Sequence, residues 1–107
     1  MDVPNMGRLA LMENLSIESF QPLVGGAFQL QTESSNLGLV LAECSPLKVS
    51  GPNVKRKPFR LIFNGALQPI LPQRIYRLAN AELGTLDMFI VPIGPQGDHM
   101  QYEAVFT

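Results

Sequence analysis

Hydrophobic and polar residues alternate along most of this chain, which is the pattern of half-buried β-strands. In residues 59–63, for example, Phe59, Leu61 and Phe63 fall on one side of an extended segment. The segments predicted as strands by this pattern or by a short apolar run are residues 27–32, 37–44, 59–63, 75–78, 85–91 and 101–106. Six short strands about ten residues apart predict a mainly β fold, a small six-stranded antiparallel barrel or a two-sheet sandwich.

The segment between residues 75 and 91 predicts a hairpin whose register can be stated. Residues 80–84 separate the two strands, and Gly84 closes this five-residue loop with a positive φ. If Ala79 faces Thr85, apolar pairs share one face of the hairpin and opposite charges meet on the other. This register places Leu78 opposite Leu86, Tyr76 opposite Met88 and Arg77 opposite Asp87.

One short helix is predicted ahead of the strands. Ser16 is a good N-cap, and Leu15 can pack onto Phe20 across the first turn. Pro22 and the Gly25-Gly26 pair end the helix after one or two turns. So short a helix needs tertiary support, so its apolar residues are expected to plug one end of the sheet: Phe20, Leu23 and Val24.

Glycine, proline and small polar residues predict where the strands stop. Turns are expected at residues 34–36 and 50–53, and Pro69 and Pro72 bar a central strand in the stretch 65–73. Further on, the prolines at positions 92 and 95 are expected to end the fifth strand and to shape a last loop over residues 94–98.

The length of 107 residues allows one hydrophobic core. Residues 1–14 show no clean period and hold three of the five methionines, so we interpret them as an N-terminal arm or extension. Residues 15–107 are predicted to form a single β domain.

Composition adds a statement about the surface. Hydrophobic residues make up 46% of the chain and charged residues only 16%, so few charges are available to cover a small domain. Some apolar surface is therefore expected to be hidden against a protein partner or a second copy of the chain. The net charge of −1 gives no general attraction to nucleic acid or to anionic membrane, and neither is expected as a partner.

The expected compartment is the cytoplasm. The single cysteine, Cys44, cannot form an internal disulfide, and no apolar run approaches the roughly 18 residues of a spanning helix. The first twelve residues, with one basic residue and a short apolar stretch, do not match a secretory signal.

Residues that could carry chemistry are few. His99 is the only histidine, which excludes sites that need a pair of histidines. Cys44 and His99 could in principle form a nucleophile–base pair, but a thiol in an apolar strand is usually inert and a loop histidine is usually solvated. We assign no catalytic, cofactor-binding or metal-binding residue. The carboxylates are interpreted as surface charges: Glu43, Glu82, Asp87, Asp98 and Glu103.

Residues 55–57, with Lys48 and Arg60 nearby, form a local basic cluster. A site for nucleic acid would combine such charges with exposed aromatic rings, whereas Phe59 and Phe63 belong to the predicted core face. The cluster is therefore interpreted as a solvated loop, with an anion or an acidic partner as the alternative.

Several motifs together are similar to a small bacterial family of unknown function. They include residues 15–25, residues 58–65, residues 71–78, and above all the run from Leu83-Gly84 to Gly94-Pro95, followed by Tyr102-Glu103-Ala104-Val105-Phe106. The resemblance covers residues 15–107 and implies no mechanism. It implies genes near phage-tail-collar-like proteins and thus an assembly or accessory role. The histidine that usually precedes proline in the family's hairpin loop is replaced here by Asn80-Ala81.

Three functions follow as hypotheses. The first is a non-catalytic binding or structural accessory module that acts through a protein surface, on a partner or on itself as a homo-oligomer. The second is a small β-barrel carrier of an apolar small molecule. The third is an enzyme that uses carboxylates or Cys44 with His99, which the scarcity of catalytic residues disfavours.

Overall fold

The computed structural model describes residues 15–48 and 57–107. Within them it contains one short helix, one 3-10 turn and six strands: α1 (Ile17–Phe20), η3 (Gln21–Leu23), β1 (Ala27–Gln31), β2 (Asn36–Pro46), β3 (Phe59–Gly65), β4 (Arg74–Asn80), β5 (Gly84–Gln96) and β6 (His99–Phe106). The predicted arm at residues 1–14 and the predicted turn at residues 50–53 lie outside the described residues.

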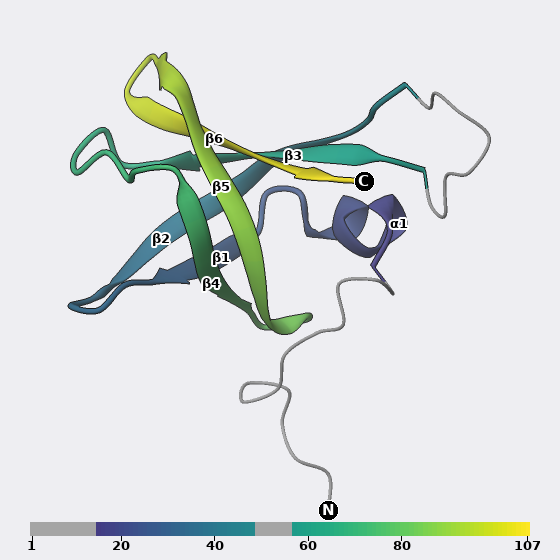
Figure 1. Ribbon diagram of the computed structural model, residues 1–107, viewed down its shortest axis with the longest axis horizontal. Coiled ribbons are helices and arrows are strands. Elements are labelled where there is room, and N and C mark those ends of the chain that lie inside the picture. Colours follow the sequence, from purple (N-terminus) through teal and green to yellow (C-terminus); the bar gives the residue numbers. More distant parts are fainter. Residues whose placement is uncertain (1–14, 49–56) are drawn as a thin grey trace, which may run out of the picture.

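The six strands close into an antiparallel barrel in the order β1-β2-β3-β6-β5-β4. Closure comes from β1, which pairs with β2 on one side and with β4 on the other, from Gln29 opposite Ala79 to Gln31 opposite Arg77. Of the two predicted architectures, the barrel is therefore the one that forms. The ring order also places β5 across the barrel from β2, and Figure 1 shows β5 crossing in front.

The barrel interior is a packed core of the inward-facing residues. Phe59, Leu61 and Phe63, predicted to share one face of β3, are all fully buried. The ring of Phe28 meets that of Phe63 edge-on, with 5.2 Å between ring centroids, a favourable aromatic geometry.

The helix closes one end of the barrel as predicted. The backbone N–H of Ser16 donates to Ser19 Oγ at 3.1 Å, which supports the first turn. The fully buried ring of Phe20 lies 5.3 Å from that of Phe106. The prediction was wrong for Val24, which is 46% exposed. A backbone hydrogen bond holds this segment to β2 instead. The N–H of the next residue, Gly25, donates to the carbonyl of Leu41 on β2 at 2.7 Å.

The predicted hairpin register is confirmed. The apolar pairs, Leu78 with Leu86 and Tyr76 with Met88, face each other in the buried interior. Arg77 and Asp87 face each other on the outside.

The hairpin loop is shorter than predicted, because β4 runs to Asn80 and β5 starts at Gly84. The Asn80 side chain explains the tight turn. Its Oδ1 accepts hydrogen bonds from the backbone N–H groups of Glu82 (2.8 Å) and Leu83 (3.0 Å), and its Nδ2 donates to the carbonyl of Ala27 at 3.1 Å. Gly84 has the predicted positive φ, at 82°.

The prediction that prolines end the fifth strand was wrong. β5 continues through Pro92 and Pro95 to Gln96, and β6 begins at His99. β5 pairs with β4 only as far as Ile90, and beyond that point only with β6. A strand with one open edge tolerates proline, because the missing N–H can lie on the edge that no strand occupies.

Candidate binding surface

Two large apolar side chains face each other on the outside of the barrel. Ile75 on β4 is directly opposite Phe89 on β5 in the strand ladder. Ile75 is 66% exposed and Phe89 49% exposed. A barrel strand normally turns polar residues outward, so an aligned pair of this size on the outer face is a candidate contact surface.

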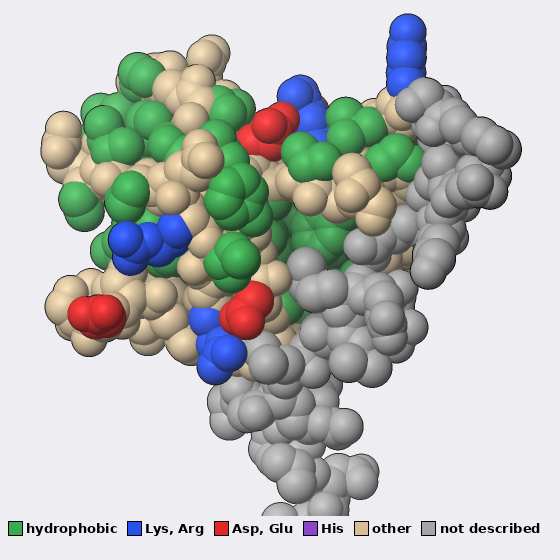
Figure 2. Space-filling view, viewed as in Figure 1, with side chains coloured by type: hydrophobic (Ala, Val, Ile, Leu, Met, Phe, Trp, Pro, Cys, Tyr) green, Lys and Arg blue, Asp and Glu red, His purple; other side chains and the backbone are tan. Residues whose placement is uncertain are grey.

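Other exposed apolar residues lie on β5 and in the loop that precedes β4. Figure 2 shows apolar side chains gathered along β5 and over the adjoining loops. We call the following set the apolar face: Leu67 and Ile70 in the loop between β3 and β4, Ile75 on β4, and Phe89 and Ile93 on β5. Each of these side chains is at least 40% exposed. The set agrees with the surface expected from the low content of charged residues.

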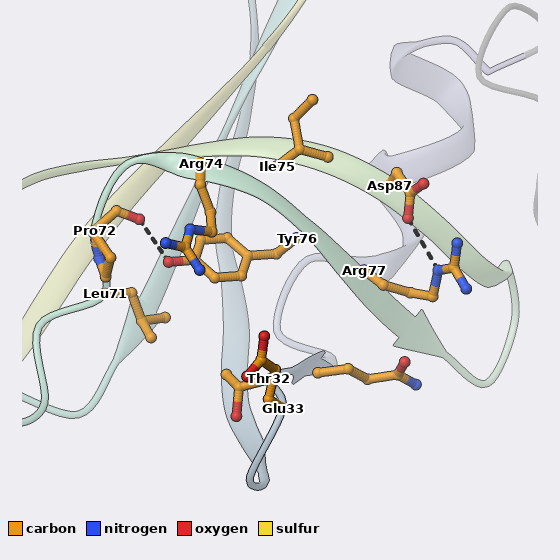
Figure 3. Close-up of a pocket in the computed structure, with 10 residues that line it drawn as sticks. Thr32, Glu33, Leu71, Pro72, Arg74, Ile75, Tyr76, Arg77 and Asp87 are labelled. Atoms are coloured by element: carbon orange, nitrogen blue, oxygen red, sulfur yellow. Dashed lines mark hydrogen bonds and ion pairs between the residues drawn. The ribbon is translucent and has the colours of Figure 1, made fainter.

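A groove of about 540 Å³ lies beside the apolar face, where β1 ends at Gln31 while β4 continues to Arg74. Ligand sites in proteins commonly occupy about 300–1,000 Å³. Figure 3 shows Thr32 and Glu33 on one wall, facing Arg74 and Tyr76 on the other. The groove is thus the space beside β4 that β1 does not fill, because β1 ends first.

Both walls of the groove are held by side-chain hydrogen bonds. On one wall, Thr32 Oγ1 donates to the carbonyl of Ser35 at 2.7 Å and accepts from the Ser35 N–H at 3.0 Å, which fixes the turn between β1 and β2. This turn begins before the predicted residues 34–36. On the other wall, the hydroxyl of Tyr76 donates to the carbonyl of Pro72 at 2.6 Å.

Two arginines line the groove, and their side chains have different partners. Arg77 Nε donates to Asp87 Oδ1 at 3.0 Å, and this hydrogen bond raises the pKa of Arg77. The guanidinium of Arg74 lies over the Tyr76 ring, 5.9 Å from its centroid, a cation–π geometry. No described carboxylate forms an ion pair with Arg74. Arg74 is therefore an oriented, exposed cation that lacks an acidic partner among the residues described.

The structure does not bring Cys44 and His99 together. Cys44 on β2 pairs with Leu61, which in turn pairs with Ala104 on β6. His99 is five residues, about 16 Å, further along β6. The thiol donates a weak hydrogen bond to the carbonyl of Ile17 at 3.7 Å, and burial raises its pKa. A reactive thiolate paired with histidine is not formed.

Arg60 of the basic cluster is neutralised by two carboxylates of the outer face. Its guanidinium bridges Glu43 on β2, at 3.2 Å, and Glu103 on β6, at 3.3 Å. Residues 55 and 56 of the cluster lie outside the described residues. His99 contacts its neighbour Asp98 at 3.2 Å. The contacts of Arg60 with Glu43 and Glu103 are surface ion pairs, as the carboxylates were interpreted from the sequence.

Buried side chains of the core occupy the barrel interior. The void lined by Gly65, Leu71 and Tyr102 at one end of the barrel measures about 20 Å³, room for one water at most. Throughout the described part of the chain, no cluster of three or more potential metal ligands is present. The same part contains no helix with the length and apolar character needed to cross a membrane.

Sequence reasoning missed the groove. The charges of Arg74 and Glu33 are visible in the sequence, but the unequal reach of β1 and β4 is a three-dimensional property of the closed barrel. A signal existed for the apolar face, because Ile75 and Phe89 both fall on the polar face of the predicted hairpin, with Arg77 and Asp87.

The comparisons with known proteins identify a family. The model of a domain of unknown function (DUF6916) matches residues 15–106, nearly the whole chain. No curated protein and no solved structure matches the chain.

Proposed function

We propose that this chain, which belongs to the DUF6916 family, acts through the apolar face. It is a non-catalytic binding or structural accessory module. Its partner is another protein or a second copy of the chain. The sequence resemblance implies an accessory role near phage-tail-collar-like proteins. Such a role would use an apolar face to contact another protein.

The aligned pair Ile75 and Phe89 carries the proposal. Their side chains lie on the outer face, where they do not contribute to the barrel core, yet they keep a large apolar area in contact with water. Covering that area with a partner removes apolar surface from water and stabilises the complex. Large exposed apolar patches commonly mark interaction sites for this reason.

The carrier hypothesis finds less support in the structure. A barrel that carries an apolar molecule needs an interior cavity of several hundred Å³, while the interior positions here are filled by aromatic and aliphatic side chains. The surface hypothesis is therefore preferred.

Photo-crosslinking tests the proposal. The photoreactive amino acid p-benzoylphenylalanine is placed at position 89 on β5, or, as a matched control, at position 40 on β2. Val40 is 44% exposed, and β2 lies across the barrel from β5. Irradiation in the producing cells should give a discrete crosslinked product from position 89 and none from position 40. Equal products from both positions, or none from position 89, would contradict the proposal.

A further inference from the structure

The groove beside the apolar face exposes one edge of β4. The residues of β4 from Arg74 to Tyr76 pair with Ile90, Phe89 and Met88 on β5. On the other side, the pairing of β4 with β1 stops at Arg77. An edge of this kind leaves backbone N–H and C=O groups available to an added extended segment.

The two arginines at this edge differ in whether they are paired with a carboxylate. Arg77 is already paired with Asp87 at 3.0 Å, whereas Arg74 has no such partner among the described residues. Arg74 lies against a ring whose hydroxyl is itself hydrogen-bonded, so Tyr76 supports the guanidinium in place. A guanidinium recognises carboxylates through charge-assisted hydrogen bonds. Glu33 on the facing wall repels an acidic group that approaches from that side.

We infer, resting on the proposed function, that the groove binds an extended segment of a partner protein that carries an acidic side chain. The segment adds to the edge of β4 at Arg74–Tyr76, and its carboxylate pairs with Arg74. Apolar residues of the same partner then cover Ile75, which lines the groove, and Phe89, which is paired with Ile75 on β5. The strand edge favours a polypeptide over a small free anion, because only a polypeptide supplies matching backbone groups.

Peptide selection tests this inference. Random decapeptides displayed on phage are selected on the full chain, and the enriched peptides are synthesised and titrated. We expect an Asp or Glu at a fixed position in them. Arg74→Gln should weaken their binding about tenfold or more, as expected for the loss of a charge-assisted pair. The matched control, the double variant Arg60→Gln/Glu43→Gln, removes an exposed charge pair between β3 and β2, outside the groove, and should leave binding within about twofold.

Three outcomes would overturn the inference. They are the absence of enriched peptides, selected peptides that bind the Arg74→Gln variant as tightly as the wild type, and displacement of the peptides by N-acetylglutamate amide at the concentration at which they displace each other. The last result would identify a site for small carboxylates.

The inference and the proposed function can fail separately. Amide chemical shifts of the labelled chain should change at residues 74–76 when a selected peptide is added. Shifts confined to other regions, together with crosslinking from position 89, would reject the groove and leave the apolar face standing. Shifts at residues 74–76 without crosslinking from position 89 would reject the apolar face.

Discussion

The hydroxyl of Tyr102, inside the barrel, accepts a hydrogen bond from the backbone N–H of Leu71 at 3.0 Å. Tyr102 is 1% exposed and belongs to β6, while Leu71 lies in the loop that leads into β4. One buried bond thus ties the loop that lines the groove to the core.

Tyr102→Phe should lower the free energy of unfolding by about 1–2 kcal/mol, because it leaves the N–H of Leu71 buried without an acceptor. Urea unfolding followed by circular dichroism measures this change. Tyr76→Phe is the control: its hydroxyl donates to the carbonyl of Pro72, a residue exposed to water, so its loss should cost less than the Tyr102 change. Equal losses for both variants would argue against a special role of the buried bond.

Asn80→Ala should lower the free energy of unfolding by about 1–2 kcal/mol, since the hairpin loop loses the acceptor for two N–H groups and the donor to Ala27. Thermal unfolding checks the loss. Asn80→Asp keeps the acceptor and should recover part of it. Full stability of the alanine variant would mean that Gly84 alone determines the turn.

The ion pairs of Arg60 predict a small pH dependence. A hydrogen bond from the Ser45 hydroxyl and the guanidinium of Arg60 lower the pKa of Glu43 from its ordinary value of 4.5. The stability due to this carboxylate is therefore present above pH 4.5 and is lost as the pH falls through the lowered pKa.

Glu43→Gln should accordingly cost less than about 1 kcal/mol at neutral pH, because the pair is exposed, and the difference from wild type should vanish in acid. Urea unfolding over a pH series measures it. Glu33→Gln, at a carboxylate without an ion pair to a described residue, serves as the control. If the difference in free energy of unfolding between Glu43→Gln and wild type grows in acid, the prediction is wrong.

Cys44 should react slowly with thiol reagents. Burial, and secondly the charge of Glu18, raise the pKa of its thiol, so less of the reactive thiolate is present near pH 8. We expect labelling by an aromatic disulfide reagent to be about tenfold or more slower in the folded protein than in urea. Similar rates in both states would show that the contact with Ile17 does not protect the thiol.

Local patterns predicted most of the fold. The pairing of Leu78 with Leu86 and of Arg77 with Asp87 follows from alternation alone, because a shift of one residue would bury charge. The choice of a barrel over a sandwich could not be made, because closure depends on the pairing of β1 with β4, which lie more than forty residues apart. The prediction that prolines end β5 was wrong for a related reason, because the sequence does not show which strand edges stay open.

The candidate site was predicted only in kind. The low charge content predicts apolar residues on the surface, and Ile75 and Phe89 are exposed apolar residues. That a partner or a second copy covers them stays a prediction. The groove at Arg74 depends on where β1 turns away at Thr32, which the local sequence places two residues too late.

Native mass spectrometry of the full chain, gently purified from the cells that produce it, tests the central claim most directly. At two widely separated concentrations, the wild type should appear as a multiple of its mass or with a bound partner protein, and so should Val40→Lys. Ile75→Lys/Phe89→Lys should appear as a bare monomer that remains folded by circular dichroism. A bare wild-type monomer at both concentrations, or a complex that survives the double substitution, would contradict a binding role for the apolar face.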